Sequence, residues 1–119
     1  MTKLQGITLL TYPVKDIAQA KMLYTKLLGV EPYADGGFYV GYKLGDQEIG
    51  LVPGGQAQGM TGPLPYFDVS DIKNTLKSME EAGAQIQQEL RDVGGGLLVA
   101  SVKDKDGNIT GFRQYPKKN

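Results

Sequence analysis

The sequence predicts an α+β fold that is built from two βαβββ modules. Two stretches about half the chain apart follow one pattern: residues 14–29 and residues 69–83 each open with Val-x-Asp-Ile and end at a Gly. A strand-like run comes before each stretch, and further strand-like runs follow it. Internal repetition at a fixed spacing is typical of a chain made of repeated structural units. We therefore expect both halves to adopt the same local fold.

Each copy of the repeat predicts one amphipathic helix. Asp16 and Asp71 stand where an N-cap side chain accepts backbone N–H groups, and Gly29 and Gly83 stand where φ turns positive at the helix end. Each helix carries an apolar stripe at the spacing that packs a helix on a sheet. The stripe consists of Ile17, Ala20, Tyr24, Leu27 and Leu28 within residues 16–28, and of Ile72, Leu76 and Met79 within residues 71–82.

Strands are expected on both sides of these helices. They cover residues 4–12, 30–33, 38–44 and 48–52 in the first half and residues 64–69, 84–90, 97–103 and 109–114 in the second. Residues 53–63 are rich in Gly and Pro and have little to bury, which predicts a linker. We expect a single domain over residues 1–119, with a first module at about residues 1–55 and a second at about residues 64–119.

The composition limits the partners and the location of the protein. Lys plus Arg and Asp plus Glu number 13 each, so no net positive field attracts nucleic acid or an anionic membrane. No apolar run is long enough to span a bilayer, and the first residues lack the apolar core of a signal peptide. Cysteine is absent, which suits a reducing compartment. We expect a cytoplasmic protein with no nucleic-acid or membrane partner.

The absence of histidine excludes several kinds of chemistry. Histidine is the usual general base near neutral pH and the commonest metal ligand, and this chain has none. Catalysis by Ser-His-Asp or Cys-His groups and metal binding through imidazole are therefore ruled out.

Three motifs together resemble those of the vicinal oxygen chelate superfamily, which includes glyoxalase I, extradiol dioxygenases and bleomycin-resistance proteins. They are Val-x-Asp before each helix, Tyr-x-Lys-Leu-Leu-Gly at residues 24–29, and Asp-Lys-Asp-Gly-Asn at residues 104–108. The resemblance implies that the eight strands form a cupped mixed sheet with two flanking helices. It also implies that the cup holds the substrate and, in the enzymes, a divalent metal ion.

The same resemblance identifies where metal ligands would lie. The enzymes carry His or Gln in the opening strand of each half and Glu in the closing strand. Here these positions correspond to Leu9, Gly50, Leu64 and Gly111. None of these side chains offers a donor to a divalent ion. We therefore expect no metal ion, no other cofactor and no catalytic residue of the usual kind.

What remains is a cavity for a ligand. Strand alternation from the four positions places on its inner face, in chain order, Leu9, Thr11, Glu48, Gly50, Leu64, Tyr66, Asp68, Gly111 and Arg113. A mostly apolar lining with a few polar groups suits a small, partly apolar ligand. Gly50 and Gly111 lack side chains, so we expect room beside them for a bulky ligand group. The resemblance also implies a homodimer.

Two alternatives remain open. Arg113 either binds an acidic group of the ligand or forms a structural ion pair with Asp68 or Glu48. Correspondingly, the protein is either a binding protein of the bleomycin-resistance type or an enzyme that uses carboxylate and Tyr chemistry, such as an isomerase, a lyase or a dioxygenase-like enzyme with an atypical metal site. Asp104 and its neighbours predict a hairpin turn rather than a calcium loop, because Ile109 and Tyr115 occupy the positions of the required Gly and Glu.

Overall fold

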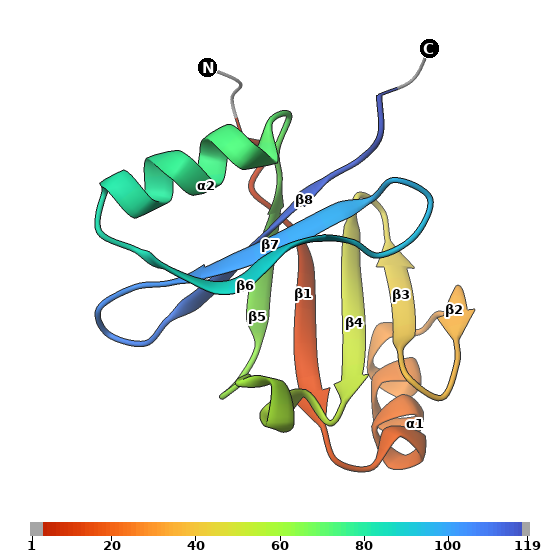
Figure 1. The fold of residues 1–119 in the computed structure, drawn as a ribbon. Helices are drawn as coiled ribbons and strands as arrows, with labels where there is room; N and C mark the ends of the chain where they lie inside the picture. The colour runs from red at the N-terminus through yellow and green to blue at the C-terminus, as the bar shows by residue number, and fades with distance from the viewer. Residues whose placement is uncertain (1–3, 118–119) are drawn as a thin grey trace. The chain divides into compact units, whose positions relative to one another are not determined.

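The computed structural model of the chain describes residues 4–117 and, for Gln58, the backbone only (Figure 1). In this part of the chain, two helices and the eight strands of a mixed sheet form the predicted α+β fold. The chain divides into two compact units. The first unit is Thr8–Leu64, and the second unit runs from Pro65 onward and includes the residues before Thr8. Residues 1–3 and 118–119 of the predicted domain lie outside the described residues.

The first unit has the βαβββ order that the repeat predicts. Its elements are β1 (Ile7–Val14), α1 (Ile17–Leu28), β2 (Ala34–Asp35), β3 (Val40–Leu44) and β4 (Gln47–Pro53), followed by the short 3₁₀ helix η1 (Gly55–Gln58). The strands lie in the order β2-β3-β4-β1. β1 is parallel to β4, whereas the hairpins β2–β3 and β3–β4 are antiparallel.

The second unit repeats this arrangement. Its elements are β5 (Leu64–Asp68), α2 (Ile72–Glu81), β6 (Gln85–Asp92), β7 (Leu98–Lys103) and β8 (Ile109–Gln114), and only the first residue of β5, Leu64, is assigned to the first unit. The strands lie in the order β5-β8-β7-β6, with β5 parallel to β8 and the other pairs antiparallel. The prediction of two modules with the same local fold is therefore confirmed. Neither α1 nor α2, the two helices of the described residues, is long and apolar enough to cross a membrane.

Both predicted N-caps are present. The Asp16 carboxylate accepts a hydrogen bond from the backbone N–H of Gln19, and the Asp71 carboxylate accepts one from that of Asn74, each at 3.1 Å. Gly29 ends α1 with a φ of 74°, a value that favours glycine. One contact near the start of α2 was not foreseen. The backbone N–H of Ile72 donates a hydrogen bond to the side-chain oxygen of Gln114, the last residue of β8, at 2.7 Å.

Each helix packs on its own unit's strands. In the first unit, Val40, Tyr42 and Leu51 form a buried cluster against which the α1 residues Ile17, Ala20, Tyr24 and Leu28 pack. In the second unit, Ile72 and Leu76 of α2 are buried with Ala100, Val102 and Phe112, and Met79 packs beside them. The prediction for Leu27 is wrong: it is 70% exposed, because it lies on the flank of the α1 stripe in the last helical turn.

Two of the strand boundaries that differ from the prediction involve a proline. The strand expected at residues 30–33 is instead the two-residue β2 at Ala34–Asp35. Pro32 has no N–H to give to a sheet, which explains why pairing begins later. β1 does not stop before Pro13 but continues to Val14. Only alternate residues of a strand donate toward a given neighbour, so a proline is tolerated where its nitrogen is not needed.

Candidate functional site

Each half-sheet has one face covered by its helix and an opposite face, which we call the helix-free face. Side chains alternate between the two faces along a strand. Because Phe112 packs toward α2, its neighbours Gly111 and Arg113 belong to the helix-free face of the second unit. By the same reasoning, Leu51 packs toward α1 and Gly50 belongs to the helix-free face of the first unit. All nine predicted ligand-binding residues lie in these half-sheets, on β1, β4, β5 and β8.

On the second unit, the ring of Tyr66 covers Gly111. The two residues are direct partners in the parallel pair β5–β8. A Cβ atom added to Gly111 would lie 2.5 Å from Cδ2 and 2.9 Å from Cγ of Tyr66, closer than real side chains approach. Burial raises the pKa of the Tyr66 hydroxyl, although Arg91 and Arg113 act in the opposite direction. The room expected beside Gly111 is therefore filled by an aromatic ring of the protein itself.

Arg113 forms an ion pair with Asp68. Its Nε donates to Asp68 Oδ1 at 2.7 Å and an Nη to Oδ2 at 3.3 Å, which is the two-pronged geometry that arginine offers a carboxylate. The Arg113 side chain is only 6% exposed and that of Asp68 is 30% exposed. The Arg113 guanidinium also lies 5.2 Å from the centre of the Tyr115 ring. Of the two alternatives for Arg113, the ion pair is the arrangement in this structure.

A second arginine on this face is absent from the predicted set. Arg91 of β6 pairs with Val99, and Val99 pairs with Arg113 on its other side. Directly opposed residues of neighbouring strands project from the same face, so Arg91 and Arg113 share the helix-free face. Arg91 is exposed. Its neighbour Leu90 packs against the helix side, so alternation from Leu90 is the sequence signal that points to Arg91.

On the first unit, two tyrosines cover a pair of glycines. Gly41 and Gly50 are partners in the β3–β4 hairpin. A Cβ atom on Gly50 would lie 2.7 Å from Cζ of Tyr39, and one on Gly41 would lie 2.9 Å from Cε2 of Tyr39 and 3.0 Å from Cε1 of Tyr33. Here too, the expected room at Gly50 is filled by the protein's own rings.

The other predicted residues of the first unit have partners within that unit. The Tyr33 hydroxyl donates to Glu48 at 2.6 Å, and Lys43 Nζ lies 4.7 Å from the centre of the Tyr33 ring. Thr11 is buried, and its hydroxyl donates to the main-chain carbonyl of Leu64 at 3.3 Å. Leu9 pairs with Glu48 in the β1–β4 ladder, as Thr11 does with Gly50. Leu9 and Leu64 are buried apolar side chains.

The structure therefore brings the predicted residues together as two groups. Leu9, Thr11, Glu48, Gly50 and Leu64 belong to the first unit, and Tyr66, Asp68, Gly111 and Arg113 belong to the second. That these residues bind a ligand remains a prediction.

The residues at the implied metal positions do not fit a divalent ion. Leu9, Gly50, Leu64 and Gly111 present no side-chain donor, and tyrosine rings cover both glycines. Within residues 4–117, no group of three or more His, Cys, Asp or Glu residues is arranged to hold a metal ion. The donor set is thus unsuited to the metal chemistry of the enzymes in the implied family.

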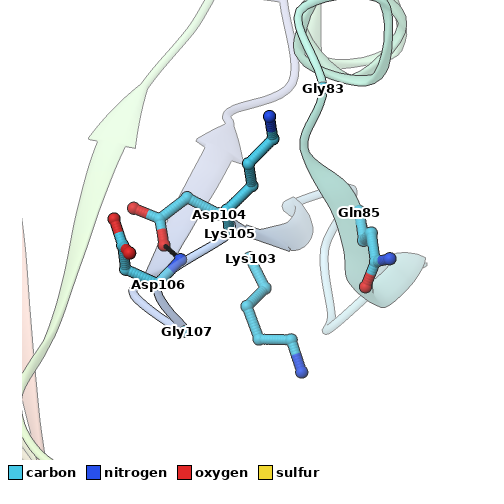
Figure 2. Close-up of a pocket in the computed structure, with 7 residues that line it drawn as sticks. All are labelled: Gly83, Gln85, Lys103, Asp104, Lys105, Asp106 and Gly107. Carbon is cyan, nitrogen blue, oxygen red and sulfur yellow. Dashed lines mark hydrogen bonds between the residues drawn. The ribbon is translucent and has the colours of Figure 1, made fainter.

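The hairpin between β7 and β8 is built as a turn. Asp104 Oδ1 accepts hydrogen bonds from the backbone N–H groups of Asp106 and Asn108, both at 2.9 Å, and Figure 2 shows the first of these. The side-chain amide of Asn108 donates to Asp104 Oδ2 at 3.0 Å. These bonds, that from the Asn108 side chain above all, lower the pKa of Asp104. A hollow of about 360 Å³ beside the turn is lined by lysines and aspartates together (Figure 2).

The chain matches one protein family. The model of the Glyoxalase/Bleomycin resistance protein/Dioxygenase superfamily matches residues 6–112. Since this match covers most of the chain, the protein belongs to that superfamily, as its motifs implied. A search of curated proteins finds no significant match.

Solved structures share the fold at low sequence identity. A superfamily member from Vibrio splendidus 12B01 is 18% identical with a TM-score of 0.70, and the match covers 94% of this chain and 99% of that one. Methylmalonyl-CoA epimerase from Mycobacterium tuberculosis is 15% identical with a TM-score of 0.72, covering 98% and 94%. The Mn(II)-bound glyoxalase from Novosphingobium aromaticivorans is 16% identical with a TM-score of 0.71, covering 100% and 43%. At such identities the likeness establishes the fold alone.

Proposed function

We propose that the protein binds a small, partly apolar molecule without a metal ion, on the helix-free face of the second unit. The observation that carries this proposal is the tyrosine ring over Gly111, at a position where the metal enzymes are expected to carry a ligand. An aromatic ring that lies over a sheet offers a flat apolar surface for a planar ligand. In keeping with the composition, we place this function in the cytoplasm.

Arg91 gives this surface its preference for acidic ligands. Arg113 is neutralised by Asp68, whereas Arg91 is exposed in the same cross-strand row. A ligand that stacks on Tyr66 and carries a carboxylate would reach the Arg91 guanidinium, which suits planar anions. The ligand class that follows is a small aromatic or amphipathic acid.

A ligand screen by thermal shift, with and without EDTA, tests this proposal. We expect an aromatic acid to raise Tm equally in both conditions, and Arg91→Ala to weaken its binding by about 1 kcal/mol, as for an exposed charge pair. Lys105→Ala, in the turn beyond the sheet, is the matched control and should bind normally. Elemental analysis should find no transition metal in stoichiometric amount. A ligand shift that EDTA abolishes, or one metal ion per chain, would contradict the proposal.

We also propose that the protein forms a homodimer. The support is a group of large apolar side chains on α1 that the described residues leave uncovered: Met22 is 75%, Leu23 62% and Leu27 70% exposed. Exposed apolar groups of this kind are typical of interaction surfaces. Light scattering at micromolar concentration should give the dimer mass, and Leu23→Glu should shift the protein to the monomer mass. A monomer mass for the unmodified protein would contradict this.

A proton-transferring enzyme is the second candidate. The Tyr33 hydroxyl and Glu48 carboxylate are 2.6 Å apart, a phenol–carboxylate pair that can accept and return a proton. Similar structures include methylmalonyl-CoA epimerase, so acyl thioesters with an acidic C–H are the substrates to try. Uptake of solvent deuterium at that carbon, lost in Glu48→Gln, would favour the enzyme over the binding protein.

A further inference from the structure

The second unit contains a cavity on its other side, beneath α2. Its volume is about 500 Å³, within the range of pockets that hold small ligands. It lies between one flank of α2, strands β5 and β8, and the segment before β1. The lining residues that the argument uses are Phe67, Val69, Thr75, Ser78, Met79 and Phe112. Because Phe67 and Phe112 pack toward α2, this cavity is separate from the helix-free face.

The repeat explains why the cavity exists. Asp16 and Asp71 are 55 residues apart, so Phe67 and Met79 correspond to Tyr12 and Tyr24 of the first unit. There, the two tyrosine rings contact one another with their centres 5.1 Å apart. In the second unit, an unbranched Met replaces the second ring, and the short side chain of Ser78 replaces Leu23 on the helix flank beside it. The space that two rings share in one unit is therefore partly empty in the other.

The lining defines the chemistry of an occupant. Five of its lining residues are apolar: Leu4, Phe67, Val69, Met79 and Phe112. Of the described residues that line the cavity, none carries a positive charge, and the single acid, Asp71, uses its carboxylate to cap α2. A charged group would lose its hydration here without gaining a partner. The hydroxyls of Ser78 and Thr110, which also line the cavity, offer hydrogen bonds to a polar end.

We propose that this cavity is a second binding site, which takes an uncharged amphipathic small molecule. Its apolar body packs between Met79 and the two phenylalanines, and its polar end meets the hydroxyls of Ser78 and Thr110. The driving force is the removal of apolar surface from water on both the ligand and the walls. This site does not depend on the function proposed for the opposite face.

A matched pair of fluorescent probes tests the proposal. N-phenyl-1-naphthylamine is uncharged, and 8-anilinonaphthalene-1-sulfonate is the same skeleton with an added sulfonate. With the full chain carrying Arg91→Ala, which weakens the site proposed for acids on the opposite face, we expect the uncharged probe to bind with one site and at least tenfold more tightly than the sulfonate. Met79→Tyr, which restores the ring pair of the first unit, should weaken the uncharged probe at least tenfold. Lys77→Leu, on the exposed side of α2, is the control and should bind as the unmodified chain does.

Two further measurements keep the test decisive. Ser78→Leu should fill the cavity independently if Met79→Tyr does not fold, and circular dichroism establishes folding in each case. An uncharged diazirine probe should label peptides from α2, β5 or β8. Labelling confined to other elements, or equal affinity for the two probes, would overturn the proposal. So would binding that appears only after residues 1–3 are removed, or that falls as protein concentration rises, because the chain itself would then fill the cavity.

Discussion

The two units cover the corresponding glycine of the helix-free face in different ways. In both, the strand parallel to the opening strand carries a glycine on the helix-free face: Gly50 opposite Thr11, and Gly111 opposite Tyr66. In the first unit, the ring that covers Gly50 is that of Tyr39, from the segment between β2 and β3. In the second unit, the covering ring belongs to the glycine's own partner, Tyr66.

This difference determines how firmly each glycine is covered. At Gly50, the atoms nearest to an added Cβ are the hydroxyl and Cζ at the tip of Tyr39, which a small rotation can move. At Gly111, they include Cγ and Cδ2 at the base of Tyr66, which are fixed by the β5 backbone. The ring over Gly50 is therefore an adjustable cover, and the ring over Gly111 is a rigid one. One βαβββ frame thus tolerates different chemistry on its helix-free face.

The largest expected effect concerns the ion pairs of the two units. Arg113→Ala should lower the free energy of unfolding by about 3 kcal/mol, because it leaves the partly buried Asp68 carboxylate without its guanidinium. The ion pair of the first unit, Lys21–Asp35, is exposed, with side chains 40% and 46% exposed. Lys21→Ala should therefore leave the urea midpoint within experimental error. Equal losses in the two variants would refute the distinction.

The next effect tests the rigid cover. Gly111→Ala should destabilise the protein by about 2 kcal/mol, because the new methyl group overlaps the base of the Tyr66 ring. In a Tyr66→Ala background the same substitution should cost much less, since the ring is gone. Urea denaturation of the four proteins gives the coupling energy. Additive costs would mean that Tyr66 does not lie over Gly111.

The adjustable cover should yield a smaller effect. Gly50→Ala is expected to cost about 1 kcal/mol, because the Tyr39 hydroxyl and Cζ must move aside. Removing only that hydroxyl, with Tyr39→Phe, should recover most of the loss in the double variant. A cost at Gly50 as large as that at Gly111 would show that the two covers are equally rigid.

The frame of each unit was predictable from local sequence. Asp16 and Asp71 cap their helices because a short carboxylate at that position can reach the N–H three residues later, and Gly29 ends α1 because its φ is positive. Such features depend only on neighbours along the chain. Leu27 was misplaced because a helical stripe has no sharp edge, and how far the strands extend over it depends on residues that are remote in sequence.

The candidate site was predictable only in part. Alternation correctly placed Gly111 beside Arg113 on one face, and Asp68 was one of the two carboxylates named as partners of Arg113. The filling of the glycine positions was missed, because a glycine in a strand signals close approach by something without identifying it. The approaching group was Tyr39 in one unit and Tyr66 in the other. Only the three-dimensional positions of these tyrosines show that the space beside each glycine is filled rather than open.

The smallest effect is a difference in the response to alkaline pH. Burial raises the pKa of Tyr66 above its ordinary value of 10.0, and burial, followed by the neighbouring Tyr12, does the same for Tyr24. In each case the unfolded chain loses its phenolic proton first as pH rises. The stabilisation by the neutral phenol is therefore complete below pH 10 and is lost as pH rises through the folded pKa.

Tyr66→Phe should make the free energy of unfolding fall less steeply above pH 10 than it does in the unmodified chain, because phenylalanine has no proton to lose. Tyr24→Phe should have a weaker effect of the same sign, since Tyr24 is less deeply buried. Urea unfolding of the three proteins at several pH values between 8 and 11 measures all three slopes. If the free energy of unfolding fell with pH equally steeply in Tyr66→Phe and in the unmodified chain, the Tyr66 hydroxyl would reach water. The ring over Gly111 would then be no tighter a cover than the ring over Gly50.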